Sequence, residues 1–379
     1  MESTDETFMR EAIALGEHGR ILAPPNPWVA SLVVSNGRIT GRGFHKKAGT
    51  PHAERLALAD AGESARGSTV YATLEPCCHH GKTPPCADEL IRAGVSRVVV
   101  AVVDPDVRVS GKGVERLRQA GIEVTVGVCE REARLSLLPY LHQRETNLPF
   151  VLLKSAISMD GRIAAKDGSS QWITGDKARA DVHQLRAESQ AVIIGSGTAL
   201  ADNPTLTVRH TPTPLPTPQQ PLRVLLDSRG RVGASGPLFD LTLAPTLVIT
   251  TAQAPKSSVN AWRASGAEIE IVSATADGVS LQETLKLLAK RGILQVLVEG
   301  GALLHSSFLK QGLVNQLSLY MGPHLLGKHG TPFFQGDGPE NIKQSIAWHL
   351  SKHHRIDDTV RLDYHFTDYH HKSTLQGKS

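Results

Sequence analysis

Four residues in the first quarter of the chain constrain its fold and chemistry more than any other feature. His52 is followed two residues later by Glu54, and Cys77 and Cys86 come further along. One imidazole and two thiolates form a ligand set that suits Zn²⁺ with a fourth position left open for water. We therefore predict that His52, Cys77 and Cys86 bind zinc. Glu54 lies beside this set without belonging to it, which predicts that it moves protons at the metal-bound water.

A histidine, two cysteines and a glutamate that is not a ligand are typical of zinc deaminases, which replace a ring amine by a carbonyl oxygen. The spacing is unusual, because eight residues separate Cys77 from Cys86 where two are common. The alternative is a closed structural zinc site with His79 or His80 as a fourth ligand. Such a site would have no use for Glu54, so the sequence favours catalytic zinc.

The composition favours an enzyme acting on small anions over a nucleic-acid binder. The chain has 379 residues, a net charge of +4, a pI near 8.8 and 4% aromatic residues, without the clustered basic charge and stacking aromatics of such binders. Four cysteines, two of them metal ligands, do not make a disulfide framework. Residues 1–20 are unlike a signal peptide and no apolar run reaches membrane length, so we expect a cytoplasmic protein.

The first part of the chain alternates helical and strand patterns, and the turn signal Asn36-Gly37 predicts a hairpin. We expect strands over residues 28–34, 38–45, 68–74, 97–103 and 122–128, and helices over 8–20, 52–61, 86–93, 113–120 and from Glu130 onward. His52 and Cys86 then lie at helix N-termini, where exposed N–H groups favour thiolate over thiol.

Leu148-Pro149 marks a predicted boundary between a domain of residues 1–147 and one of residues 148–369, with a tail over 370–379. The second domain again alternates strand and helix, so we expect an α/β fold with a mainly parallel sheet. Its expected strands are 150–156, 191–194, 223–227, 246–251, 268–272 and 294–299, and its expected helices are 176–187 and 280–290. The proline-rich residues 211–221 are interpreted as an exposed insertion.

The chemistry of the second domain is less explicit in the sequence. A strand ending in Glu299 runs through Gly300-Gly301 into a helix, an arrangement that offers backbone N–H groups to a phosphate but is also common in tight turns. Gly195-Ser196-Gly197 lacks the third glycine of the dinucleotide-binding fingerprint. Trp172 could bind a ligand or simply pack in the core, and Arg186 could bind an anion or simply be a solvated cation at the surface. The residues alone predict an anion-binding α/β domain.

Longer motifs are present in both domains. The N-terminal motifs are Pro25-Asn26-Pro27, Gly43-Phe44-His45, His52-Ala53-Glu54, Thr73-Leu74-Glu75-Pro76-Cys77 and the segment from His79 to Cys86. The C-terminal motifs are Ser158-Met159-Asp160-Gly161, Ser170-Gln171-Trp172-Ile173-Thr174, the segment from Asp202 to Arg209, and Val298-Glu299-Gly300-Gly301. With them, the chain to about residue 366 resembles the bifunctional deaminase–reductase family of riboflavin biosynthesis.

The resemblance implies a cytidine-deaminase-like three-layer domain followed by a dihydrofolate-reductase-like α/β domain that binds NADPH. It implies two reactions, the zinc-dependent hydrolytic deamination of a diaminopyrimidinone ribosyl phosphate and the NADPH-dependent reduction of its ribosyl group to a ribityl chain. The implied partners are small phosphorylated pyrimidines and further copies of the chain, in a dimer or tetramer. Nucleic acids and membranes are not expected partners.

The resemblance also assigns individual residues. It gives zinc binding to His52, Cys77 and Cys86 and the proton shuttle to Glu54. It gives contacts with the deaminase substrate to Asn26, His45, His79 and Lys82. It gives NADPH binding to Ala156, Trp172, Thr198, Asp202, Ser228, Gly300 and Gly301. It gives contacts with the reductase substrate to Ser170, Arg186, Leu206, Arg209 and Glu299.

Four positions depart from the family pattern: Ala23, Ala30, Cys78 and Asp106. Cys78 is not expected to bind zinc, because adjacent cysteines rarely bind one ion. The carboxylate of Asp106 is expected to repel a substrate phosphate. Two other functions remain open, a nucleic-acid base deaminase with an accessory domain and a non-catalytic zinc-stabilised relative.

The choice of cofactor has some support from the sequence itself. Ser228-Arg229 follows an expected strand and Arg231 lies close behind. A hydroxyl with one or two arginines suits the 2′-phosphate of NADPH, since a guanidinium pairs with phosphate in a planar fork. The alternative is an ordinary surface turn, because serine and glycine are common there.

Overall fold

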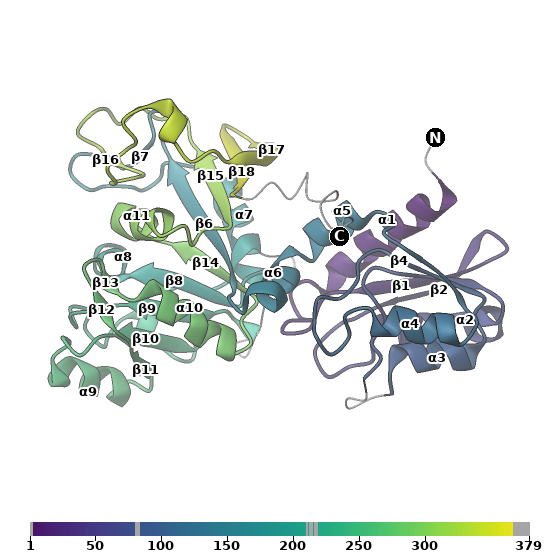
Figure 1. The fold of residues 1–379 in the computed structure, drawn as a ribbon. Coiled ribbons are helices and arrows are strands. Elements are labelled where there is room, and N and C mark those ends of the chain that lie inside the picture. The colour runs from purple at the N-terminus through teal and green to yellow at the C-terminus, as the bar shows by residue number, and fades with distance from the viewer. Residues whose placement is uncertain (1–2, 80–83, 210, 212–214, 216–218, 367–379) are drawn as a thin grey trace. The chain divides into compact units, whose positions relative to one another are not determined.

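The computed structural model describes residues 3–79, 84–209, 211, 215 and 219–366 (Figure 1). These residues form two compact units, and the chain passes from the first to the second between Leu148 and Pro149. This division lies one residue beyond the expected boundary. The proposed tail, and most of the proline-rich insertion, lie outside the described residues.

The first unit is built on a five-stranded sheet in the order β2-β1-β3-β4-β5. Strand β1 is antiparallel to β2 and β3, whereas β3, β4 and β5 are parallel. Figure 1 shows α2, α3 and α4 on one face of this sheet and α1 and α5 on the other, so the unit has the expected three layers. The strands are β1 (Ala30–Ser35), β2 (Arg38–Phe44), β3 (Thr69–Ala72), β4 (Arg97–Val100) and β5 (Glu123–Val126), and the helices are α1 (Thr4–Gly16), α2 (Ala53–Ala61), α3 (Cys86–Ala93), α4 (Lys112–Gln119), α5 (Glu130–Ser136) and α6 (Leu138–Thr146).

The prediction of a first helix over residues 8–20 was wrong at both ends. Helix α1 begins at Thr4 because Ser3 and Glu6 form a capping box, in which each side chain accepts a hydrogen bond from the other's backbone N–H. The α-helix ends at Gly16, and Glu17–Gly19 continue as a 3-10 turn. The amphipathic pattern indicated that a helix lies here, but it did not identify the residues at which the helix begins and ends.

Helix α2 lies very close to β2, and this contact positions the predicted zinc site. A Cβ atom at Gly43 would lie 2.2 Å from the carbonyl oxygen of Ala53, and one at Gly41 would lie 2.2 Å from that of Ala57. Only glycine fits such distances. The two glycines therefore hold the first turn of α2, and with it His52 and Glu54, against the sheet.

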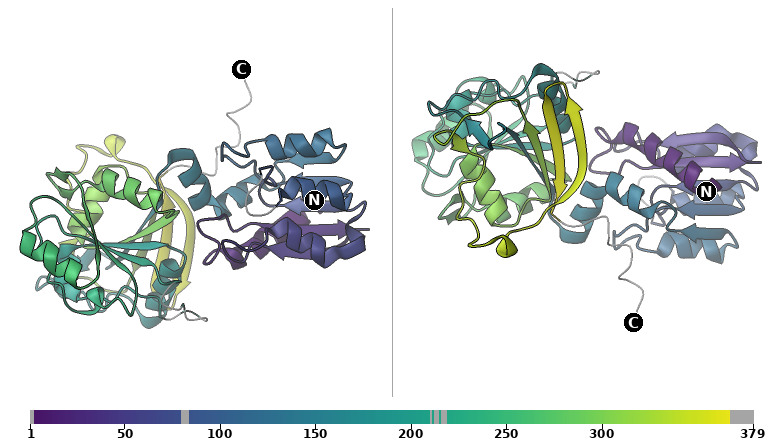
Figure 2. Two further views of the ribbon diagram at one scale, coloured as in Figure 1. Left: turned by 90° about the horizontal axis from the view of Figure 1, so that it is seen from below. Right: turned by 90° about the horizontal axis from the view of Figure 1, so that it is seen from above.

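The second unit contains a nine-stranded sheet in the order β11-β10-β9-β8-β14-β6-β15-β18-β17. All neighbouring strands from β11 to β15 pair in parallel, which confirms the prediction of a mainly parallel sheet. Strands β18 and β17 add an antiparallel edge, drawn in yellow in Figure 2, that the sequence did not predict. The sheet's strands are β6 (Phe150–Ile157), β8 (Ala191–Gly195), β9 (Leu222–Leu226), β10 (Thr246–Thr250), β11 (Glu268–Ile271), β14 (Gln295–Glu299), β15 (Gln316–Met321), β17 (His349–Ile356) and β18 (Thr359–His365).

Helices and two short antiparallel ladders, β12 with β13 and β7 with β16, complete this unit. The helices are α7 (Asp176–Ala187), α8 (Ser196–Asp202), α9 (Lys256–Ala264), α10 (Leu281–Lys290) and α11 (Ala302–Lys310), and the short strands are β7 (Arg162–Ala164), β12 (Ala274–Thr275), β13 (Gly278–Val279) and β16 (Thr331–Pro332). Among the residues that the structure describes, no helix is long and apolar enough to cross a membrane.

A fully buried arginine fixes the loops around the start of β9. The guanidinium of Arg223 donates hydrogen bonds to the backbone carbonyls of Thr205, Pro237, Asp240 and Ala244, at 3.3, 2.6, 3.0 and 2.6 Å. These carbonyls come from two segments that have little regular structure of their own. Arg223 therefore takes the place of a backbone ladder in holding them together.

We expect Arg223→Met to lower the free energy of unfolding by about 3 kcal/mol, because it leaves several buried carbonyls without a donor. Denaturant unfolding measures the change. Arg291→Met is the matched control, since Arg291 pairs with the partly exposed Glu268 and Glu270 and such pairs contribute below about 1 kcal/mol. Equal losses in the two variants would contradict this role of Arg223.

Candidate functional site

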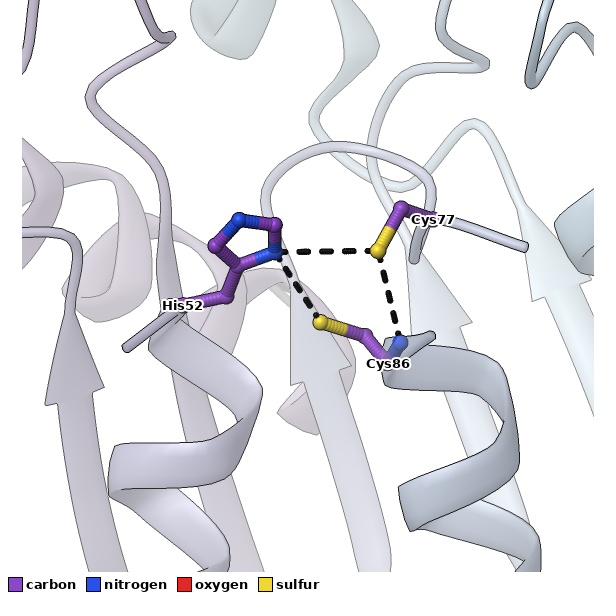
Figure 3. A group of neighbouring side chains, drawn as sticks. All are labelled: His52, Cys77 and Cys86. Atoms are coloured by element: carbon purple, nitrogen blue, oxygen red, sulfur yellow. Dashed lines mark hydrogen bonds between the residues drawn. The ribbon is translucent and has the colours of Figure 1, made fainter. Parts of the chain in front are cut away.

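The structure brings His52, Cys77 and Cys86 together in the first unit (Figure 3). His52 is the residue before α2, Cys86 is the first residue of α3, and Cys77 lies in the loop after β3. His52 Nδ1 lies 3.3 Å from Cys86 Sγ and 3.6 Å from Cys77 Sγ, and all three ligand atoms lie within 4.8 Å of one another. One imidazole and two thiols at these distances fit a zinc ion with one position left open. In the described part of the chain, this is the only such group of three or more metal-binding side chains.

The local structure stabilises negative charge on Cys77. Its sulfur accepts a hydrogen bond from the backbone N–H of Cys86 at 3.3 Å, at the N-terminus of α3. Hydrogen bonds from the Cys86 thiol and from His52 further lower the pKa of Cys77. The hydrogen bond with Cys77, together with burial, raises the pKa of Cys86. The helix N-terminus therefore favours the thiolate form of Cys77.

Glu54 lies in the first turn of α2, with only 6% of its surface exposed. Burial, together with the charge of Cys77, raises its pKa. One of its carboxylate oxygens, Oε2, is buried and has no hydrogen-bond partner. A buried carboxylate oxygen normally has a hydrogen-bond partner. This oxygen lies beside a ligand set with an open position, so it could accept a hydrogen bond from a water bound there.

Asn26 and His45 lie next to the ligand set. The side-chain N–H of Asn26 donates to His45 Nε2 at 3.1 Å, and His45 Nδ1 donates to the carbonyl oxygen of Pro51 at 3.2 Å. The His45 ring packs edge-on against His52, with centroids 5.5 Å apart, and burial lowers the pKa of His45. The neutral His45 thus fixes the orientation of the Asn26 amide.

The other two residues expected to contact the deaminase substrate lie between the two cysteines. His79 is described, and its buried Nδ1 has no hydrogen-bond partner. Lys82 lies outside the described residues, as does His80, which the alternative of a closed zinc site invoked. Cys78 does not belong to the ligand group, and its thiol points to the carbonyl oxygen of Arg108 at 3.7 Å.

Asp106 does not present an uncompensated charge. Its carboxylate accepts hydrogen bonds from the Arg108 side chain at 2.9 and 2.6 Å and lies 3.5 Å from Arg144. The Arg108 guanidinium lowers the pKa of Asp106 to about 2. The repulsion expected from the sequence is therefore offset locally. Ala23 and Ala30, the other two departures, are buried in the core.

In the second unit, a cluster of charges lies at the ends of α7 and β14. Arg186 donates to both oxygens of Glu299, at 2.5 and 2.9 Å, and the pair is almost fully buried. Arg209 lies nearby, and its backbone N–H donates to His183 at 3.2 Å. The sequence alone left Arg186 open as a solvated cation, and the structure excludes this.

Lys154 belongs to the same cluster, and it was not among the residues selected from the sequence. It lies on β6 directly opposite Glu299 of β14, and burial lowers its pKa. A signal was present, because Lys154 is the only charged residue in the strand Phe150–Ile157. Charged residues are rarely buried without a partner, so a lysine inside an apolar strand indicates a functional or paired cation.

The residues expected to bind NADPH are spread along the adjacent strand ends. Ser228 lines a cavity of about 160 Å³ with residues of β8, α8, β13 and α11. A Cβ atom at Gly301 would lie 3.8 Å from the Thr198 hydroxyl, so α8 and the Gly300-Gly301 turn are neighbours. Asp202 ends α8 and Ala156 lies on β6. Trp172 is 61% exposed, with Arg179 stacked 4.1 Å from its ring centroid.

The two remaining residues expected to contact the reductase substrate lie on loops. Ser170 lies two residues before Trp172. Leu206 is 3% exposed and has a positive φ of 56°, an unusual conformation for leucine. Its side chain packs in the main core of the unit. The structure therefore brings Arg186, Arg209 and Glu299 together, while Leu206 is mainly a core residue.

Comparison with known proteins covers both units. The family model of the RibD C-terminal domain matches residues 149–362, and that of the cytidine and deoxycytidylate deaminase zinc-binding region matches residues 2–102. The riboflavin biosynthesis protein RibD of Chlamydia pneumoniae is 52% identical over 359 residues, covering 91% of this chain and 95% of the relative. The RibD protein of Aquifex aeolicus is 42% identical over 324 residues, which cover 86% of this chain and 88% of the relative.

Solved structures agree with this result. Acinetobacter baumannii RibD, in one of its two forms, is 39% identical with a TM-score of 0.86, covering 96% of this chain and 98% of the other. A deaminase/reductase from Thermotoga maritima is 35% identical with a TM-score of 0.83 and the same coverage. The chain therefore belongs to the RibD family of riboflavin biosynthesis proteins, and it combines a zinc-dependent deaminase domain with an NADPH-dependent reductase domain.

Proposed function

We propose that residues 1–147 deaminate 2,5-diamino-6-ribosylamino-4(3H)-pyrimidinone 5′-phosphate, and that residues 148–369 then reduce the ribosyl group of the product to a ribityl chain. The observation that carries the first step is the buried, unpaired carboxylate oxygen of Glu54 beside the three-ligand group. The Thermotoga maritima relative is described as a diaminohydroxyphosphoribosylaminopyrimidine deaminase and 5-amino-6-(5-phosphoribosylamino)uracil reductase.

In the deamination, His52, Cys77 and Cys86 would hold the zinc ion, which would make a bound water acidic near neutral pH. Glu54 takes a proton from this water as its oxygen adds to the ring carbon that carries the amine. Glu54 then delivers the proton to the amine nitrogen. The second proton of the water passes to the ring nitrogen as the C–N bond breaks, so that ammonia leaves and the oxygen from water remains as the ring carbonyl.

The neighbouring residues bind and orient the substrate in this proposal. Asn26, held by His45, presents its free amide oxygen and remaining N–H to the pyrimidine. Its fixed orientation supports this role, because an amide that cannot flip presents one pattern of donor and acceptor. His79 and Lys82 are proposed to bind the ribose phosphate, because an imidazole N–H and an ammonium group can both donate hydrogen bonds to phosphate oxygens.

For the reduction, NADPH supplies a hydride when it is bound. The ring-opened ribosyl group accepts the hydride at C1′ and a proton at the attached nitrogen. We propose that Arg209 binds the phosphate and that the Arg186–Glu299 pair contacts the sugar, with Ser170 and Leu206 completing the site. Residues proposed to hold NADPH are Ala156, Trp172, Thr198, Asp202, Ser228, Gly300 and Gly301.

We further propose a cytoplasmic location and a homo-oligomer, either a dimer or a tetramer. None of the four cysteines forms a disulfide, which is usual in a reducing compartment. Strand β17 ends the nine-stranded sheet with an exposed edge, and exposed edges are common sites of association. The mass in solution, measured by light scattering, tests the oligomeric state.

Product analysis with and without NADPH tests the two-step function. Without NADPH, the diaminopyrimidine substrate is expected to yield ammonia and the ribosylaminouracil phosphate alone. With NADPH, the ribityl compound is expected, with one NADPH oxidised per molecule. Release of ammonia from polynucleotides but not from this substrate would instead favour a nucleic-acid base deaminase. No turnover of either, with zinc bound, would favour a non-catalytic relative.

The pair of adjacent cysteines allows a direct test of the ligand assignment. Cys77→Ser is expected to lose bound zinc, since it replaces a thiolate ligand with a weak hydroxyl ligand. Cys78→Ser is the matched control and is expected to keep one zinc per chain, because Cys78 lies outside the ligand group. Metal analysis of the purified proteins measures both. Retention of zinc in Cys77→Ser together with its loss in Cys78→Ser would reverse the assignment.

A further inference from the structure

Arg231, one of the two arginines that the sequence indicated for a phosphate, lies in the cavity beside Ser228. Arg231 lines this cavity together with Ser196, Ser228 and Asp277, whereas Arg229 is not among the lining residues. The Arg231 guanidinium donates to Ser196 Oγ at 2.6 Å. This hydrogen bond holds the end of a long flexible side chain at one point of the cavity wall.

The position of the cavity in the sheet determines which part of a dinucleotide can reach it. It lies at the carboxyl ends of β8 and β9, the edge at which open α/β sheets bind ligands. Glu299 and its charge cluster lie at the end of β14, and β9 is two strands away from β14. Neighbouring strands are about 4.8 Å apart, so the two places are separated by about 10 Å across the sheet. If the nicotinamide reaches the sugar at Glu299, the adenosine half extends toward Arg231.

The charge of Arg231 is available for a ligand. Among the described residues, no carboxylate lies within salt-bridge distance of it, whereas Arg186 is fully engaged with Glu299. The only acidic residue that lines the cavity is Asp277, which is exposed on the turn between β12 and β13. A guanidinium with two neighbouring hydroxyls offers several donors to the three oxygens of a phosphate monoester.

We propose that Arg231, oriented by Ser196 and assisted by Ser228, binds the 2′-phosphate of NADPH and makes the reductase prefer NADPH to NADH. The inference rests on the proposed reductase function and gives it a residue that determines specificity. Arg229, two residues earlier, does not line the cavity and has no part in this contact. Ser196 acts as a positioning residue, through Arg231.

Binding of nucleotide fragments tests the proposal without any turnover. Adenosine 2′,5′-bisphosphate and 5′-AMP differ only in the 2′-phosphate, and calorimetry on the full chain gives both affinities. The wild type is expected to bind the bisphosphate more tightly than 5′-AMP. Arg231→Ala is expected to weaken binding of the bisphosphate about 10- to 100-fold, as for loss of a charge-assisted contact. Its affinity for 5′-AMP is expected to stay the same.

Arg229→Ala is the matched control, because it removes the same charge two residues away. Its affinities for both nucleotides are expected to equal those of the wild type. Arg231→Lys is expected to recover part of the preference, because it keeps the charge but not the planar fork. An Arg231→Ala protein that still prefers the bisphosphate as strongly as the wild type would overturn the inference alone. A wild type that binds neither nucleotide would overturn the proposed reductase site as well.

Discussion

Replacement of Glu54 by glutamine is expected to leave zinc in place and to reduce the rate of deamination by about 10²–10⁴-fold. Glu54 lies beside His52, Cys77 and Cys86 but outside the ligand group. Glutamine has nearly the same shape and can still accept a hydrogen bond, so the packing of the first turn of α2 should persist. It cannot take up a proton from water, and both proton transfers in the reaction would lose their carrier.

Three measurements on Glu54→Gln separate this role from others. Metal analysis is expected to give one zinc per chain, because a ligand set of one histidine and two cysteines remains. Reduction of the supplied deaminated substrate is expected to be unchanged, since the charge cluster of the second unit lies on other elements. Glu63→Gln changes an exposed glutamate of the same unit and is expected to deaminate normally. Loss of zinc from Glu54→Gln would mean that Glu54 is itself a ligand.

The sequence was most informative where chemistry and local structure coincide. His52 and Cys86 were expected at helix N-termini, and the structure places them at the starts of α2 and α3. A helix start is determined by nearby residues, so it can be recognised without the rest of the fold. The approach of α2 to β2 was not predicted, because it depends on Gly41 and Gly43 facing a helix ten residues later in the chain.

The C-terminal edge of the second sheet shows a limit of such prediction. Strand β17 is exposed along most of its length, so its sequence lacks the apolar alternation by which a half-buried strand is recognised. Its partner β18 has alternating buried and exposed residues and carries Asp363, which is 2% exposed and bonds to Ser318 of β15. A buried aspartate paired with a distant serine is visible only once the strands are adjacent.

The basic residues after β9 show a second limit. Arg229 and Arg231 are two residues apart, and both suit a phosphate on composition. The backbone turns at Gly230, where φ is +69°, and only Arg231 then reaches the cavity. Sequence can therefore indicate the segment that binds a phosphate, whereas the direction of each side chain depends on the turn.

The two arginines of the reductase cluster differ in the structure, although the family resemblance gives them one role. Arg186 is buried and its charge is balanced by Glu299. Arg209 is more exposed, and its side chain donates to the Thr207 hydroxyl at 3.1 Å. Partial desolvation, together with the charge of Arg186, lowers its pKa. A second cation beside a neutral pair leaves a net positive charge. Arg209 is therefore the better candidate for the substrate phosphate.

We expect Arg209→Ala to raise the KM for the phosphorylated reductase substrate about 100-fold, since a charged pair with two hydrogen bonds contributes about 3 kcal/mol. The kcat of reduction is expected to change less, because the phosphate is remote from C1′, and deamination is expected to be unaffected. Steady-state kinetics of each half-reaction measures these values. Arg209→Lys is expected to fall between wild type and alanine, since it keeps the charge without the planar fork.

The dephosphorylated substrate provides the decisive control for Arg209. Without its phosphate, this compound should be reduced equally poorly by the wild type and by Arg209→Ala, because the contact that distinguishes them is absent. Arg263→Ala, which removes an exposed arginine of α9, should behave as wild type with both substrates. If Arg209→Ala impaired reduction of both substrates equally, Arg209 would act on the sugar or the fold. The phosphate would then have to bind another cation, and Lys154, half-buried opposite Glu299, would be the next residue to substitute.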